Sequence, residues 1–81
     1  MHLEIITPDK RLYEGEVVAV QFPGTAGSFE VLNNHAALIS TLEAGTIRVR
    51  NGQGEVTIPV GGGLVEVLNN KVTVLASTVS K

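Results

Sequence analysis

Residues 46–60 read Thr-Ile-Arg-Val-Arg-Asn-Gly-Gln-Gly-Glu-Val-Thr-Ile-Pro-Val, and this stretch establishes the fold class. Apolar and polar side chains alternate on both sides of the turn residues 51–54. A period of two puts one face of a β-strand against a core and the other face in solvent. A turn of this length that is rich in Asn and Gly joins two such strands into a hairpin. The side chains expected to point inward are those of Ile47, Val49, Val56, Ile58 and Val60.

The remaining apolar segments are also strand-like. Alternation recurs over 72–76, whereas the segments 3–6, 17–20 and 64–68 are partly apolar on both faces. Strands of this second kind are expected in the centre of a sheet or beneath a covering partner. Three consecutive glycines over 61–63 predict a break in the sheet or a close approach of two backbones.

A helical period does not extend over ten or more residues anywhere in the chain, and we expect only one helical turn, over 34–38, with Asn34 as its N-cap. Short strands with regularly spaced turns predict an all-β fold. The expected architecture is a small β-sandwich or flattened barrel of roughly eight to ten short antiparallel strands, without a long helix. We expect a single domain over residues 1–77 and a frayed tail over 78–81.

Composition argues against several classes of function. The chain has 81 residues, with 6 Lys and Arg against 8 Asp and Glu, and these charges are scattered. There is no basic stripe, and the aromatic residues are only Tyr13, Phe22 and Phe29, so nucleic-acid binding is disfavoured. The apolar runs are far shorter than the roughly 20 residues that span a bilayer. We therefore expect contact with a membrane only through another protein.

The reactive side chains do not form a catalytic or metal-binding pattern. His35 has no Asp or Glu within three residues, and the only other histidine is His2. A zinc site or a general base needs further ligands or partners at suitable spacing. The sequence therefore predicts no catalytic, cofactor-binding or metal-binding residue and no enzyme activity. One alternative stays open: Lys71 follows a hairpin turn, as does the modified lysine of lipoyl and biotinyl carrier domains, although its neighbours differ from theirs.

The stretch 23–45 has a distinctive pattern of glycines, apolar residues and one histidine, made of Pro23, Gly24, Gly27, Phe29, Val31, Leu32, His35, Ala36, Leu38, Leu42 and Gly45. With this pattern the stretch is similar to the N-terminal domain of the ε (epsilon) subunit of F-type ATP synthases. Further pieces of the chain, over 3–8, 62–67 and 70–76, fit the same family. Most members of that family continue into a helical hairpin, so the resemblance covers only the β-sandwich part.

The resemblance implies a non-catalytic central-stalk (rotor) subunit of the F1 sector of a proton-translocating F1Fo ATP synthase. Such a subunit binds the γ (gamma) subunit and the c ring within the alpha/beta/gamma/epsilon complex and couples ion flow to ATP synthesis. Its implied place is peripheral, on the cytoplasmic face of the bacterial plasma membrane, with membrane contact only through the Fo sector. The implied γ contacts are His35, Ala36, Leu38, Ser40 and Thr41, and the implied c-ring contacts are Ala26, Ser28 and Glu30.

Two further expectations concern single residues of the stretch 23–45. Many relatives have a carboxylate where this chain has Ser28, and we expect Glu30 to take its place on the same face. Gly45 closes the stretch, and we expect it to hold a positive φ, a conformation that favours glycine.

Overall fold

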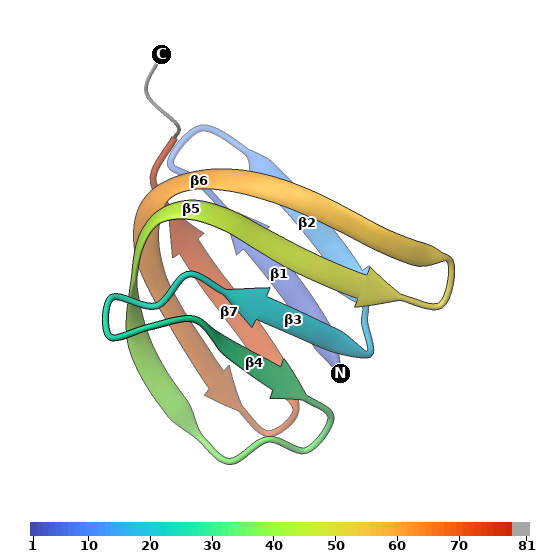
Figure 1. The fold of residues 1–81 in the computed structure, drawn as a ribbon. Coiled ribbons are helices and arrows are strands. Elements are labelled where there is room, and N and C mark those ends of the chain that lie inside the picture. The colour runs from blue at the N-terminus through green and yellow to red at the C-terminus, as the bar shows by residue number, and fades with distance from the viewer. Residues whose placement is uncertain (79–81) are drawn as a thin grey trace.

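The computed structural model describes residues 1–78, and over these residues it contains strands but no helix (Figure 1). All strands belong to one sheet with the order β2-β1-β7-β6-β5-β3-β4. The all-β prediction is therefore confirmed. The strands are β1 (His2–Ile6), β2 (Arg11–Glu16), β3 (Ala19–Phe22), β4 (Phe29–Leu32), β5 (Leu38–Asn51), β6 (Gly54–Leu68) and β7 (Lys71–Ala76).

The expected set of roughly eight to ten short antiparallel strands is wrong in two respects. The described chain has seven strands, and β5 and β6 are long, with 14 and 15 residues. In addition, β1 and β7 pair in parallel. The long strands stay paired with each other from the hairpin turn to their far ends, so each takes the place of two of the short strands expected.

Because β5 and β6 bend at mid-length, the sheet folds over into two layers (Figure 1). The first layer consists of β2, β1, β7, the second half of β6 and the first half of β5. The second layer consists of the first half of β6, the second half of β5, β3 and β4. The fold is thus the predicted β-sandwich, made from one continuous sheet.

Glycines permit the bend. Gly62 and Gly63 have φ angles of 110° and 155°, which favour glycine. A Cβ on Gly63 would collide with the carbonyl oxygen of Leu75 in β7. The amide of Gly61 donates to the carbonyl of Ser77 at 2.9 Å. The predicted close approach of two backbones is confirmed, whereas β6 bends at this point without breaking.

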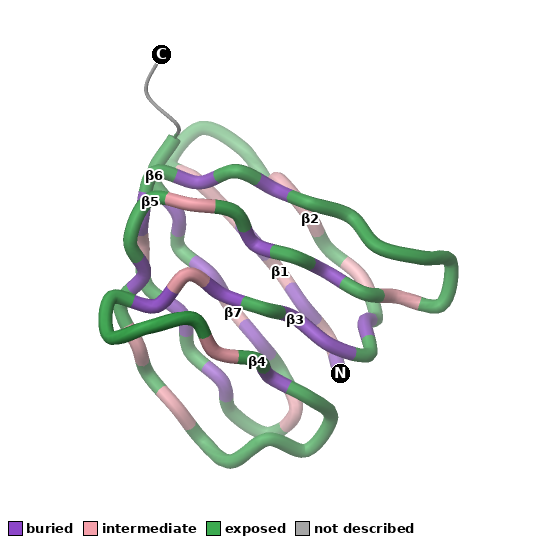
Figure 2. The backbone as a smooth tube through the Cα atoms, in the orientation of Figure 1, coloured by how far each residue is buried: buried purple, intermediate pink, exposed green. Residues whose placement is uncertain are grey.

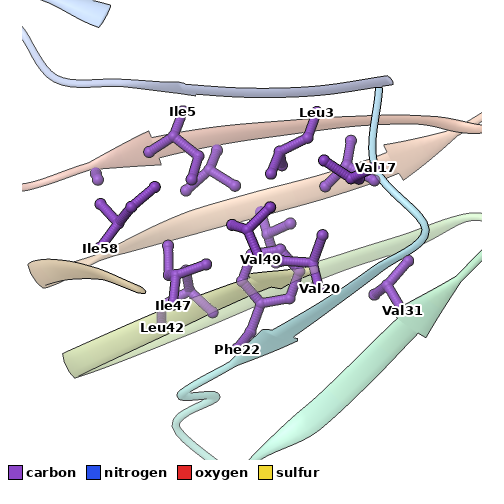
Figure 3. Packing of buried hydrophobic residues seen from close by; sticks show 14 of the residues in the cluster. Leu3, Ile5, Val17, Val20, Phe22, Val31, Leu42, Ile47, Val49 and Ile58 are labelled. Atoms are coloured by element: carbon purple, nitrogen blue, oxygen red, sulfur yellow. The ribbon is translucent and has the colours of Figure 1, made fainter. Parts of the chain in front are cut away.

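The core fills the space between the layers. Figure 3 shows Phe22, Ile47 and Val49 of the second layer pointing toward Leu3 and Ile5 of the first, and all five side chains are fully buried. The predicted inward positions of the hairpin are confirmed at Ile47, Val49, Ile58 and Val60.

Val56 is the exception among the predicted inward residues, because it is 40% exposed. It lies near the free end of the β5–β6 hairpin, which is exposed and projects beyond the rest of the sandwich (Figure 2). Val56 therefore points to the predicted face of the strand, since it pairs with the buried Val49, but no part of the other layer covers it there.

The two hairpin turns are as expected, and the helical turn is absent. Asn51 pairs with Gly54 across the first turn. Asn69 and Asn70, at the second turn, have φ angles of 52° and 61°, as a type I′ turn requires. The helical turn expected over 34–38 is wrong: residues 35–37 belong to no helix and β5 begins at Leu38. Asn34 has a φ of 64°, whereas an N-cap residue lies in the β region.

The expected positive φ of Gly45 is also wrong, since this residue is not among the glycines with positive φ. A Cβ on Gly45 would lie 3.0 Å from Cβ of Pro23, so tight packing, not backbone conformation, favours glycine here. Except for Thr78, the tail expected over 78–81 lies outside the described residues.

Candidate functional site

The turn between β4 and β5 presents His35 and Ala36 at the surface. Both residues are exposed, and Nδ1 of His35 donates to the carbonyl of Ala36 at 2.8 Å. The turn is tied to the Asn69–Asn70 hairpin, because the amide of Asn34 donates to Oδ1 of Asn70 at 2.8 Å. His35 is therefore an exposed side chain on a fixed turn. Within residues 1–78, no three His, Cys, Asp or Glu side chains come together as metal ligands.

The first half of β5 places its residues on two faces. Leu38 and Ser40 are half-buried on the inner side, and Leu38 packs against the core. Ile39 and Thr41 point to the outer side, and Ile39 is 68% exposed. The predicted contacts Leu38 and Ser40 thus have limited access, whereas Ile39, which the sequence analysis did not single out, is the most accessible large apolar side chain of the segment.

The loop between β3 and β4 carries Ala26 and Ser28, and both are exposed. Gln21 donates from Nε2 to Oγ of Ser28 at 3.0 Å and lies opposite Glu30 in the pairing of β3 with β4. These side chains therefore share the outer face of the second layer, as expected for Ser28 and Glu30. Glu30 is not a free carboxylate, because it lies 3.8 Å from Nη2 of Arg50.

Beside this loop the surface is hollowed. The open hollow has a volume of about 550 Å³, and Gln21, Gly24, Ser28, Glu43 and Arg48 are among the residues that line it. Its charged side chains carry one negative and one positive charge, and it is wide open to solvent. It could seat a polar loop of a partner, but it contains no arrangement of acid, base and nucleophile for catalysis.

The two predicted contact segments lie at opposite ends of β4, with 26–28 before it and His35 after it. They are nevertheless connected through Thr25. The amide of Thr25 donates to the carbonyl of Thr41 at 3.2 Å, and the two hydroxyl oxygens lie 2.7 Å apart. The structure thus joins the predicted c-ring loop to the far end of the predicted γ segment.

Four exposed apolar side chains lie on the outer face of the first layer around the exposed Glu66; we call them the outer apolar surface and define it as Ile39, Leu64, Leu68 and Leu75. All four side chains are exposed. Leu64 pairs with Thr41 on one side and with Leu75 on the other, so the surface crosses β5, β6 and β7. The sequence indicated part of it, because 64–68 is partly apolar on both faces, but it gave no sign that Ile39 and Leu75 lie beside this segment.

Among residues 1–78, no helix is long and apolar enough to cross a membrane. Lys71, the residue of the carrier-domain alternative, is exposed and follows the Asn69–Asn70 turn at the start of β7. These features are shared by many small β-domains, and the comparison with known proteins distinguishes among them.

The family model of the ATP synthase delta/epsilon chain β-sandwich domain matches residues 1–81. The chain belongs to this family. A curated ATP synthase epsilon chain of Leptospira borgpetersenii serovar Hardjo-bovis (strain JB197) is 41% identical over 75 residues, which are 93% of this chain and 59% of the relative. The epsilon chain of Synechocystis sp. (strain ATCC 27184 / PCC 6803 / Kazusa) is 44% identical over 75 residues, or 93% of this chain and 55% of the relative.

Solved structures confirm the fold. A chain of the Euglena gracilis mitochondrial ATP synthase (OSCP/F1/c-ring in rotational state 1) superposes with a TM-score of 0.85 at 21% identity, over 91% of this chain and 48% of that chain. A chain of the Tetrahymena thermophila mitochondrial ATP synthase central stalk and c ring gives a TM-score of 0.83 at 20% identity, over 95% and 63%. This chain thus spans between about half and two thirds of the relatives it matches, and the family membership favours the stalk interpretation over a carrier domain.

Proposed function

We propose that this chain is the β-sandwich part of a non-catalytic central-stalk subunit of an F1Fo ATP synthase. In this role it binds the γ subunit and the c ring, and it helps the two to turn as one body while ion flow through the ring is coupled to ATP synthesis. It is peripheral to the membrane, on the side where the F1 sector lies. The relatives named as ATP synthase epsilon chains and the two stalk and c-ring assemblies of similar fold support the proposal.

The observation that carries the proposal is the outer apolar surface. Most large apolar side chains of a small domain are buried, and a cluster of exposed ones on one face is typical of a protein interface. Here the cluster adjoins the predicted γ segment, because Ile39 and Thr41 pair across β5–β6 with Glu66 and Leu64. We assign the outer apolar surface together with residues 35–41 to γ, and the loop at 26–30 to the c ring.

The shape of the domain fits a part that transmits force. A rotor subunit needs contact surfaces held at a fixed separation and no moving chemistry. The bent strands β5 and β6 run through both layers. The strands beside the loop at 26–30 and the strands of the outer apolar surface therefore belong to one hydrogen-bonded sheet. We expect a load applied at one contact to reach the other through this sheet.

Binding to γ is tested by co-purification of the full 81-residue chain with the γ subunit of the same organism. We expect a stable complex and at least about tenfold weaker binding for Leu75→Glu, because a charge is buried in an apolar contact. Val56→Glu is the matched control, since Val56 is also an exposed apolar residue but lies near the free hairpin end. Failure of the unmodified chain to bind γ, or equal losses for both variants, would contradict the proposal. A mass shift located on Lys71 would favour the carrier domain instead.

A further inference from the structure

The folded sheet leaves four strand edges without a neighbouring strand in the part of the chain that the structure describes: β2, β4, the first half of β6 and the first half of β5. An open edge exposes backbone N–H and C=O groups that can pair with another strand. Soluble proteins protect such edges with charges, proline, bulges or very short strands. The four edges can therefore be compared by the protection that each one carries.

Three of these edges are protected. β2 carries Arg11, Glu14 and Glu16, which form ion pairs with neighbouring side chains of β1 or β2 at 3.0 to 3.2 Å. The first half of β6 contains Glu55 and Pro59, and a proline has no N–H to offer. β4 has only four residues, among them a charged Glu.

In the first half of β5 the only charged residue is Glu43, whose amide already donates to the carbonyl of Pro23, and the residues before it have none of these devices. Residues 38–42 read Leu-Ile-Ser-Thr-Leu, without a charge or a proline, and Ile39 in the middle is 68% exposed. Figure 1 shows this part of β5 at the outer side of the first layer, next to the second half of β6. A strand of this composition at an open edge is typical of a site where a further strand is added.

The backbone of Ile39 faces this open edge. The two-residue turn at Asn69–Asn70 makes Leu68 and Lys71 a hydrogen-bonded pair, so that residues 64, 66 and 68 of β6 bond to β7 and residues 65 and 67 bond to β5. Their partners in β5 are 40 and 38. By alternation, the N–H and C=O of Ile39 and Thr41 point away from β6.

An independent contact confirms this direction. The carbonyl of Thr41 accepts a hydrogen bond from the amide of Thr25, which lies beyond the edge of the first layer. Ile39 lies two residues before Thr41, so its N–H and C=O point in the same direction as those of Thr41. No described residue bonds to the N–H or C=O of Ile39 on that side. The Thr25 loop therefore covers the far end of the edge and leaves Ile39 open.

We propose that an extended, uncharged segment of the γ subunit pairs with Ile39 and extends the first layer by one strand. This inference rests on the proposed function for the identity of the partner. The N–H and C=O of Ile39 supply two hydrogen bonds to the added strand, and the exposed Ile39 side chain favours an apolar neighbour beside it.

The partner is a larger protein, not a second copy of this chain. Two copies paired edge to edge would prolong the sheet and leave Leu64, Leu68 and Leu75 of both copies in water. An edge of five residues alone buries far less than the roughly 1,200 Å² of a stable interface. In contrast, a partner that adds a strand and also lies across the outer apolar surface covers both features, because Ile39 stands opposite Glu66, between Leu64 and Leu68 of β6.

Amide hydrogen exchange of the full chain, alone and with the γ subunit, tests the pairing. We expect the Ile39 amide to exchange rapidly in the free chain and at least about tenfold more slowly in the complex. The Ser40 amide is the internal control, since it bonds to β6 and is protected in both states. A complex in which Ile39 stays unprotected overturns the pairing alone; absence of any complex overturns the proposed function as well. Protection of Ile39 that grows with concentration of the free chain would instead identify a second copy and overturn the assignment.

A pair of variants separates the backbone from the side chain. Ile39→Pro and Ile39→Thr both replace the isoleucine side chain by a smaller one, but only proline removes the N–H, and this N–H makes no bond inside the sheet. We expect the Pro variant to bind γ at least about tenfold more weakly than the Thr variant, with far-UV circular dichroism unchanged for both. Equal affinities of two folded variants for γ would overturn the pairing. If the Pro variant does not fold, the hydrogen-exchange experiment on the unmodified chain tests the pairing instead.

Discussion

The hydroxyl oxygens of Thr25 and Thr41 lie 2.7 Å apart, and the amide of Thr25 donates to the carbonyl of Thr41. Thr25 directly precedes the segment 26–30 that we assign to the c ring, and Thr41 ends the segment that we assign to γ. Gly24 and Leu42 form a β-bridge beside this pair. The two contact regions therefore meet at one place, where the first layer bends into the second.

The hydroxyl pair predicts an energetic coupling between the two segments. We expect Thr25→Val and Thr41→Val each to lower the free energy of unfolding by about 1 kcal/mol, because each loses the same hydrogen bond. The double variant should lose less than the sum of the two, with a coupling energy of about 0.5 to 1 kcal/mol. Urea unfolding of the unmodified chain, the two single variants and the double variant measures this coupling energy. Strict additivity would mean that the two hydroxyls do not interact.

The loop assignment is tested by cross-linking in the assembled enzyme. A cysteine introduced by Ser28→Cys should form a disulfide with a cysteine placed in the polar loop of a c subunit. Ser28 is exposed and its hydroxyl has only Gln21 as a side-chain partner, so the substitution leaves the loop backbone unchanged. Gln53→Cys is the control: it is also exposed, but it lies in the hairpin turn at the other end of the second layer. Cross-linking at position 53 in place of position 28 would contradict the proposed orientation.

The sequence predicts the strands well where one face is buried, because alternation at Ile47, Val49, Ile58 and Val60 depends only on neighbouring residues. The number of strands depends on whether a glycine segment bends or breaks a strand. At Gly61–Gly63 the pairing with β5 resumes beyond the bend, and this outcome is set by contacts with residues distant in sequence, such as Leu75 and Ser77. The three glycines and their neighbours in sequence do not show by themselves that β6 continues beyond the bend.

The candidate site was predictable to a similar degree. Family resemblance indicated single residues of two segments, and all except the half-buried Leu38 and Ser40 are exposed: Ala26, Ser28, Glu30, His35, Ala36, Leu38, Ser40 and Thr41. It did not indicate Ile39 or Leu75, since their shared face exists only when β5, β6 and β7 lie side by side. The open edge of β5 follows from the strand order, because the crossover after β4 leaves the first half of β5 without a second neighbour.

The bend itself gives a prediction about stability. Gly63→Ala should lower the free energy of unfolding by about 3 kcal/mol or more, since the new Cβ would meet the carbonyl of Leu75 and the residue has a positive φ. Gly52→Ala is the matched control, because no atom lies within 4 Å of its added Cβ and its φ is not positive. We expect the control to change the free energy of unfolding by less than about 0.5 kcal/mol. Thermal unfolding of both variants measures the difference, and equal melting temperatures would contradict this account of the bend.

Gly45 tests whether close packing or backbone conformation requires a glycine. An added Cβ would lie 3.0 Å from Cβ and 3.3 Å from Cγ of Pro23, while φ is not positive. We therefore expect Gly45→Ala to destabilise the domain by about 1 to 2 kcal/mol through overpacking. Pro23→Gly removes both facing carbons and keeps the Pro23 carbonyl that accepts from the amide of Glu43. In that background Gly45→Ala should cost less than about 0.5 kcal/mol, because the collision is absent. If the cost were the same in both backgrounds, the strain would lie in the backbone of Gly45 and not in its contact with Pro23.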